Sequence, residues 1–305
     1  MEKHRKKLIK NVAVFDGHSS GLAQGKKIVS EDDIVTEITV DEVSEENFDE
    51  VFDGTGMVAM PGMMDAHVHM GCLFAKGEFP VDYATVLTVA KCKDALMAGF
   101  TTFRDAGSVS EGLKLAFDEG VLPEPRIYPC GAYISQTCGH GDSEYAHTYR
   151  DIQYRHPSST VLADGVPEII RAVREQFYRG ASHIKLMATE ILNRHEDIRL
   201  LFGTDMMITG PDYQVEQSED IRYYEKRFGT MRALRALTGT ANEVFALTTY
   251  QNPYPKGKIG VLEAGAFADL LLVDGDPTKR VSVLADTDHL RLIMKGGTVY
   301  KNTLC

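Results

Sequence analysis

The sequence has few cysteines, no long apolar run and no excess of positive charge. Its five cysteines contain no C-x-x-C pair, and they match neither a disulfide framework nor a structural zinc site. No apolar run reaches the roughly 18 residues of a membrane-spanning helix, and the basic N-terminal segment lacks the apolar stretch of a signal peptide. We therefore expect a cytoplasmic protein with buried, reduced thiols and no membrane partner.

Acidic residues outnumber basic residues by 44 to 33, which gives a net charge of -11. Because nucleic-acid binding usually requires a basic surface, this balance argues against a nucleic-acid partner. The chain of 305 residues corresponds to one large domain or two smaller ones, and a hydrophobic content of 43% is enough for a sizeable core.

Residues 60–187 alternate between strand and helix patterns. Apolar spacing and capping residues predict helices over 80–98, 110–122 and 166–181, and short apolar segments predict strands at FTTFRDAG, PRIYPCGAY and HIKLMAT. Such alternation is typical of an α/β fold with parallel strands and crossover helices. Further along, residues 230–247 predict a helix, a turn and a second helix.

Both ends of the chain have strand patterns. Residues 7–15, 26–43 and 258–277 are strand-like, and residues 289–302 predict a closing hairpin with Gly296-Gly297 at its turn. We expect residues 1–59 and 256–305 to form one β domain, beside an α/β domain over residues 60–255.

The sharpest motif is DAHVHMG, residues 65–71. Side chains alternate along a strand, so His67 and His69 point the same way. Two imidazoles on one face at the C-terminal end of a strand form half of a metal site. The alternative is a pair of surface histidines.

Three other residues could belong to the same site. Lys185, in HIKLMAT, shares a strand face with His183 and Met187, while Ile184 and Leu186 face the helices. Lys185 is either a carboxylated metal ligand or a lysine that extends to the barrel mouth. Asp205 follows the apolar run LLF, which reads as a strand that ends at this aspartate, and it is either a ligand and proton acceptor or a turn aspartate. His140, between two glycines, either approaches a ligand or is solvated.

Taken together, these segments resemble the metal-dependent amidohydrolase superfamily. The nearest branch holds imidazolonepropionase-like enzymes, Xaa-Pro and Xaa-Arg dipeptidases, and related carboxypeptidases and ochratoxin-type amidases. The resemblance rests on KNVAVFDG, MPGMMDAHVHMG, AGFTTFRDAG, PRIYPCGAYISQTCGHGD, SHIKLMAT, LFGTD and IGVLEAGAFADLLLVDGDP. It implies a TIM barrel with a β-sandwich built from both termini.

The resemblance also implies a site with one or two divalent metal ions, for which zinc is the first candidate. His67 and His69 would bind the first metal, and a carboxylated Lys185 would bridge both metals. Asp205 would bind the first metal and act as the acid/base, and His140 would face the substrate.

One part of the family pattern is missing. Two further histidines, ligands of the second metal, belong between Lys185 and Asp205, but this interval has only 19 residues and one histidine, His195. A βαβ unit takes about 30 residues, so about three βα units are absent through an internal deletion. The remaining strands cannot close an eight-stranded barrel, and their edges would need a partner chain or a rearranged helix as cover.

Two functions remain open. A hydrolase would cleave a C–N bond, amide or peptide, in a small molecule or dipeptide through metal-activated water, for which three protein ligands at zinc are sufficient. A shortened, catalytically impaired remnant would instead bind a metal or a partner protein. With either function, a homo-oligomer is one way for the chain to cover its open sheet edges.

Overall fold

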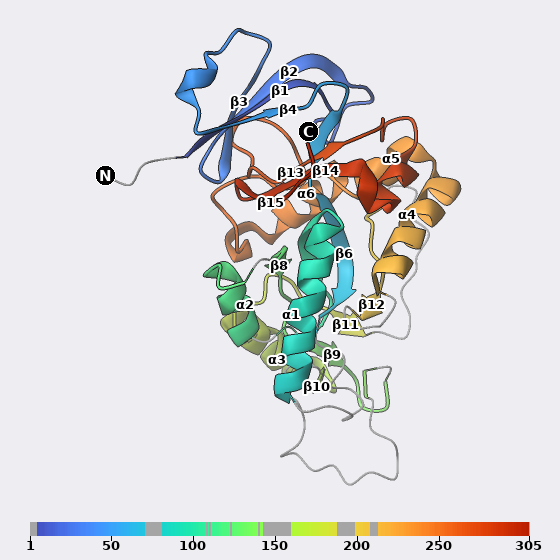
Figure 1. Cartoon of the computed structure of the whole chain (residues 1–305). Coiled ribbons are helices and arrows are strands. Elements are labelled where there is room, and N and C mark those ends of the chain that lie inside the picture. The colour runs from blue at the N-terminus through green and yellow to red at the C-terminus, as the bar shows by residue number, and fades with distance from the viewer. Residues whose placement is uncertain are drawn as a thin grey trace.

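The computed structural model describes residues 5–70, 81–107, 109, 111–122, 124–139, 141–142, 160–187, 199–207 and 213–304. Strands from both ends of the chain lie together at the top of the molecule, and most of the α/β elements lie below them (Figure 1). No helix in the described ranges has the length and apolar character needed to cross a membrane.

The two ends of the chain share one eight-stranded sheet, in the order β15-β14-β13-β5-β1-β2-β3 with β4 beside β1. β5 and β13 join the N-terminal and C-terminal strands in antiparallel register. The strands are β1 (Lys6–Val14), β2 (Ala23–Glu31), β3 (Ile34–Thr39), β4 (Glu50–Asp53), β5 (Val58–Pro61), β13 (Leu270–Val273), β14 (Leu290–Lys295) and β15 (Thr298–Asn302). The sandwich arrangement and the domain bounds stay predictions.

The predicted hairpin at the C-terminal end is confirmed. β14 and β15 pair in antiparallel register, and both turn glycines, Gly296 and Gly297, have positive φ angles of 53° and 70°. Positive φ at both central positions is the geometry of a type I′ turn.

The α/β part begins with a parallel sheet in the order β12-β6-β7-β8. Its strands are β6 (Met63–His69), β7 (Phe100–Asp105), β8 (Arg126–Tyr128) and β12 (Met206–Met207), and the crossover helices are α1 (Val81–Met97) and α2 (Glu111–Asp118). These helices and the parallel pairing confirm the predicted α/β fold.

A second parallel sheet has the order β10-β9-β11, with β9 (Tyr133–Ser135), β10 (Thr160–Leu162) and β11 (Leu186–Met187), and it packs against α3 (Val166–Tyr178). The prediction of one strand over PRIYPCGAY was wrong. The chain instead turns at Gly131, whose φ is +69°, and places β8 and β9 in different sheets. Within the described residues, these two parallel sheets form no closed barrel.

Two smaller predictions about strands were also wrong. Leu186 does not face the helices: it lies on the edge strand β11 and is 57% exposed. The strand predicted to end at Asp205 is instead the two-residue β12, which begins after it. Asp205 has a φ of +54°, and this left-handed conformation interrupts the extended backbone.

The remaining α-helices follow Asp205: α4 (Tyr213–Phe228), α5 (Thr230–Ala236) and α6 (Gly239–Phe245). The short 3-10 helices are η1 (Glu45–Asn47), between β3 and β4, and η3 (Ala246–Gln251), η4 (Val281–Ala285) and η5 (Thr287–His289), after α6. α5 and α6 confirm the predicted helix–turn–helix. α4 was not predicted, because its sequence is mostly polar and has no regular apolar stripe.

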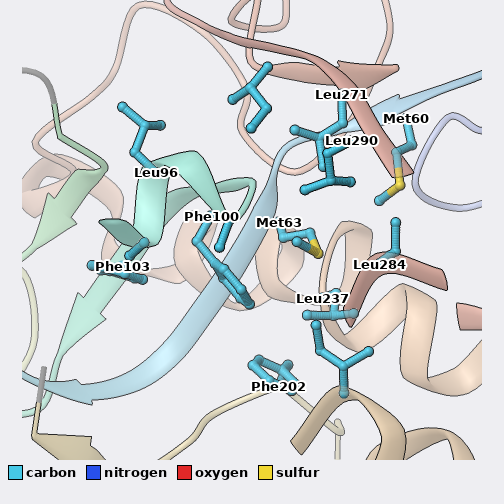
Figure 2. Packing of buried hydrophobic residues seen from close by; sticks show 14 of the residues in the cluster. Met60, Met63, Leu96, Phe100, Phe103, Phe202, Leu237, Leu271, Leu284 and Leu290 are labelled. Carbon is cyan, nitrogen blue, oxygen red and sulfur yellow. The ribbon is translucent and has the colours of Figure 1, made fainter. Parts of the chain in front are cut away.

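One hydrophobic cluster joins the eight-stranded sheet to the α/β part (Figure 2). Leu271 and Leu290 from the sheet meet Met63 and Phe100 of β6 and β7, and Phe202 packs on Phe100 with ring centroids 5.8 Å apart. Full burial of such a side chain contributes about 1.5–3 kcal/mol, so this cluster fixes β6 against both parts of the molecule.

The described cysteines are free thiols. Cys92 and Cys130 are buried, as predicted, but Cys138 is exposed, which contradicts the expectation that all of the thiols are buried. Cys72 and Cys305 lie outside the described residues.

Candidate metal centre

His67 and His69 lie at the C-terminal end of β6, at the edge of the parallel sheet where its strands end. The intervening residues of β6, Ala66 and Val68, are buried on the opposite face, as strand alternation requires. Asp205 reaches this edge because its backbone N–H donates to the carbonyl oxygen of His67 at 2.7 Å, directly before β12 pairs with β6.

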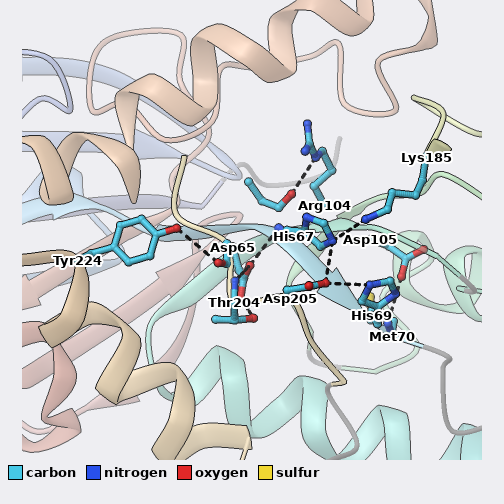
Figure 3. Close-up of polar contacts among 12 residues, drawn as sticks. Asp65, His67, His69, Met70, Arg104, Asp105, Lys185, Thr204, Asp205 and Tyr224 are labelled. Carbon is cyan, nitrogen blue, oxygen red and sulfur yellow. Dashed lines mark hydrogen bonds and ion pairs between the residues drawn. The ribbon is translucent and has the colours of Figure 1, made fainter. Parts of the chain in front are cut away.

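Three side chains converge at this edge (Figure 3). Oδ1 of Asp205 lies 2.9 Å from Nε2 of His67 and 3.2 Å from Nε2 of His69. One ligand atom from each of the three side chains lies within 4.8 Å of the others. The geometry therefore brings together two imidazole nitrogens and a carboxylate oxygen, the three groups that the family resemblance implied for the first metal, although their roles stay a proposal.

Lys185 joins the same group from the second parallel sheet. Its Nζ lies 2.8 Å from Nε2 of His67, and its carbonyl oxygen accepts the N–H of Ile134 in β9. Nε2 of His67 thus faces both Nζ of Lys185 and Oδ1 of Asp205. A neutral imidazole nitrogen is either a donor or an acceptor, so it cannot satisfy both neighbours at once.

Burial and charge keep both imidazoles neutral. Burial, together with the ammonium of Lys185, lowers the pKa of His67 to about 4. Burial also lowers the pKa of His69, against the opposing effect of Asp205. Neutral imidazole is the form that binds metal ions, so both histidines are ready to act as ligands near neutral pH.

The donor set fits a divalent cation. Two neutral imidazoles and one carboxylate are ligands that zinc accepts, and three protein ligands leave a fourth position open. The ammonium of Lys185 would repel a dication at this distance. A carbamate on the same nitrogen would be an anion with oxygen ligands and would fit instead.

Two buried carboxylates that the sequence analysis did not select hold the strand ends in place. Asp105, at the end of β7, accepts the N–H groups of Met70 and Val109 at 3.1 and 3.2 Å. Asp65, in β6, accepts the N–H of His67 at 3.1 Å. Burial raises the pKa of Asp65 to about 6 and that of Asp105 to about 7.

A useful signal for both was available in the sequence. Each acid lies within an apolar strand segment, MMDAHV or TFRDAG, where a carboxylate is costly unless it accepts hydrogen bonds. The same reasoning applies to Arg104, whose Nε donates to the carbonyl oxygen of Ala66 at 2.8 Å.

His183 lies near the site but outside the converging group. Burial and the charge of Arg104 lower its pKa to about 3, and its Nδ1 lies 3.0 Å from Oγ of Ser182. It is therefore a neutral, internally bonded imidazole. His140, predicted to face the substrate, and His195 lie outside the described residues.

The sequence model of the amidohydrolase family matches residues 58–198, which include His67, His69 and Lys185. The match covers a little less than half of the chain, so the chain is similar to this family over that segment. An ochratoxinase from Aspergillus niger is 34% identical to this chain over 152 residues, which are 43% of this chain and 31% of the ochratoxinase. The chain thus covers less than a third of the length of this relative.

Solved structures show the same fold. A prolidase complexed with N-methylphosphonate-L-proline has a TM-score of 0.83 and 21% identity, over 97% of this chain and 100% of the prolidase. The crystal structure of A. niger ochratoxinase has a TM-score of 0.79 and 18% identity, over 99% and 96% of the two chains. At these identities the comparison establishes the fold alone.

Proposed function

We propose that this protein is a metal-dependent amidohydrolase, which hydrolyses an amide or peptide bond in a small molecule or dipeptide and depends on a divalent metal, most simply zinc. The observation that carries the proposal is the convergence of His67, His69 and Asp205 at the edge of the parallel sheet. The names of its relatives, an ochratoxinase and a prolidase, support the same bond type.

His67 and His69 would hold the metal through Nε2, and Oδ1 of Asp205 would complete the set of three protein ligands. A divalent cation at this position supplies Lewis acidity, which makes water nucleophilic near neutral pH and polarises a carbonyl group. Asp205 is suited to proton transfer because its side chain is 72% exposed, so substrate and water can reach the carboxylate.

In the proposed reaction, Asp205 takes the proton of the attacking water and passes it to the leaving nitrogen. The C–N bond breaks, the carbonyl carbon gains the oxygen of water, and the products are a carboxylate and an amine. General acid–base catalysis of this kind contributes about 10²–10⁴-fold to a rate.

Lys185 has a separate proposed role. Its neutral amine would add to CO₂ and release a proton, which converts the ammonium beside His67 into a carbamate with two oxygen ligands. Such a group could hold a second metal ion. The internal deletion and the missing second pair of histidines stay predictions, because residues 188–198 lie outside the described part of the chain.

One observation favours the second candidate, a remnant that binds a metal or a partner without catalysis. Within the described residues, β12 is at the end of its sheet and the parallel strands do not close into a barrel. Without the remaining strands, a substrate pocket would be incomplete even if the three ligands bind a metal. Activity therefore decides between the two candidates.

The test is hydrolysis of a panel of dipeptides and N-acyl amino acids by zinc-loaded protein, with release of amine as the readout. The hydrolase proposal expects turnover that His67→Ala abolishes and Asp205→Asn lowers by about 10²-fold or more. Zinc binding without turnover of any panel member would favour the remnant, and turnover unchanged by His67→Ala would exclude this site as the catalytic centre.

A further inference from the structure

The segment that carries Asp205 has a strand on only one side among the residues that the structure describes. β12 is at the end of the order β12-β6-β7-β8, and in the described ranges its paired neighbour is β6. Asp205 itself has a left-handed φ of +54°. A non-glycine residue in this conformation is uncommon and persists where the surrounding structure holds it. Side-chain contacts must therefore supply what a neighbouring strand would supply.

Asp65 makes these contacts. Its Oδ1 accepts the N–H of His67 at 3.1 Å and the N–H of Thr204 at 3.3 Å. Its Oδ2 accepts the hydroxyl of Thr204 at 2.9 Å and Nε2 of Gln217 at 3.2 Å. One buried carboxylate thus joins the strand with the histidines, the turn before Asp205 and helix α4. Figure 3 shows Asp65 between Thr204 and His67.

Helix α4 also contacts the chain segment before Asp205, through Tyr224. The hydroxyl of Tyr224 donates to the carbonyl oxygens of Leu201 and Gly203, at 3.2 and 3.5 Å. The ring of Tyr224 packs on Phe202, with centroids 4.9 Å apart.

The turn is also pressed closely onto the ligand strand. A Cβ atom on Gly203 would lie 2.8 Å from Cβ of His67, so only glycine fits at this contact. A displacement of the turn would therefore move Asp205 relative to His67 directly.

We propose that Asp65, through Thr204 and Gln217, is a positioning residue that sets Asp205 against His67 and His69. The proposal rests on the proposed function, because the position of Asp205 matters only if the three side chains bind a metal. Asp65 does not touch the metal or the substrate. It acts through the turn of residues 203–205 and through β6.

The alternative is that Asp65 only stabilises the fold. A structural role would lower the free energy of unfolding but would leave the metal affinity and the ligand geometry of the folded protein unchanged. A positioning role changes both the metal affinity and the ligand geometry. Loss of a residue that holds metal ligands in place weakens metal binding by about 10–100-fold.

Thr204 offers the cleanest pair of variants. Thr204→Val removes the hydroxyl that donates to Asp65 and keeps the shape, whereas Thr204→Ser keeps the hydroxyl. Asp65→Ala removes the carboxylate and all of its hydrogen bonds to His67, Thr204 and Gln217. Glu225→Gln is the matched control on α4, because its carboxylate accepts the N–H groups of Val281 and Ser282, away from the site.

The experiment measures Co²⁺ affinity by competition with a coloured chelator, the visible absorption of the Co²⁺ protein, and the melting temperature without metal. We expect Asp65→Ala to weaken Co²⁺ binding by about 10–100-fold and Thr204→Val to weaken it by about 10-fold, both with altered spectra. Thr204→Ser should restore wild-type values, and Glu225→Gln should lower only the melting temperature.

Two results would overturn the proposal in distinguishable ways. Wild-type affinity and spectrum in folded Thr204→Val and Asp65→Ala would reject positioning while the metal site stands. No Co²⁺ binding by the wild-type protein would reject the metal site and, with it, the positioning role. If Asp65→Ala does not fold, Thr204→Val alone decides.

Discussion

Asp205 meets His67 twice: its backbone N–H donates to the carbonyl oxygen of His67 at 2.7 Å, and its Oδ1 lies 2.9 Å from Nε2 of the same residue. The first contact fixes the backbone of the turn, and the second brings the carboxylate to the imidazole. Because the two contacts use the same pair of residues, the metal centre is assembled by pairing the chain before β12 with β6.

Loss of either histidine should remove the metal. His69→Ala eliminates one of three ligand atoms, and the remaining imidazole and carboxylate leave too few protein ligands for zinc. Zinc content after dialysis should fall to the level of the metal-free protein. His18→Ala, which changes an exposed histidine in the loop between β1 and β2, should retain full zinc. Equal zinc content in both variants would contradict the assignment.

Lys185→Arg tests the carbamate. Arginine keeps a positive charge beside His67 but cannot be carboxylated near neutral pH, because it stays protonated. We expect bicarbonate to raise the number of metal ions bound per wild-type chain from about one towards two. It should not change the number bound by Lys185→Arg. The same response to bicarbonate in both proteins would show that the carbamate forms elsewhere or not at all.

Glu124 should make stability depend on pH. Its side chain is 1% exposed, neither carboxylate oxygen has a hydrogen-bond partner among the described residues, and burial raises its pKa to about 8 despite the nearby ammonium of Lys295. The folded protein therefore keeps this proton over a range in which the unfolded chain, with an ordinary pKa near 4.5, has lost it. The free energy of unfolding should fall as pH rises from about 4.5 to about 8, by up to about 1.4 kcal/mol per pH unit from this group.

Glu124→Gln removes that titration. The variant should be more stable than the wild-type protein at pH 8, and the difference should shrink towards pH 5. Urea denaturation at the two pH values measures it. An unchanged difference between pH 5 and pH 8 would mean that Glu124 is ionised in the folded protein.

Phe202 connects the turn before Asp205 to the main core. It is fully buried and packs on both Phe100 and Tyr224. Phe202→Ala should cost about 3–5 kcal/mol in the free energy of unfolding, because it leaves a cavity at this junction. Val86→Ala, on the exposed face of α1, should change stability by no more than about 0.5 kcal/mol. Similar losses for the two variants would contradict the packing described for Phe202.

The parts of the fold that could be predicted from sequence are those set by local patterns. The alternation of His67 and His69 follows from the two-residue period of a strand, and the Gly296-Gly297 turn follows from backbone sterics. The contacts that Asp65 makes and the position of α4 could not be predicted in the same way. The role of Asp65 depends on Thr204 and Gln217, which are distant in sequence, and α4 is held by tertiary contacts such as Tyr224 rather than by an apolar stripe.

The convergence of the ligands was predicted less directly. Motifs placed His67, Lys185 and Asp205 in three separate segments, and only the family resemblance implied that they meet. The division of PRIYPCGAY between two sheets and the left-handed backbone at Asp205 were missed, because a short apolar run does not reveal where a strand breaks.

The central claim is tested most directly by the metal content of folded protein purified with zinc and dialysed, measured by elemental analysis together with Asp205→Ala. The account predicts at least one zinc per wild-type chain and loss of that zinc in the variant. About two per chain would further support a carboxylated Lys185 that holds a second ion. A wild-type protein that is folded and retains no zinc would contradict the account.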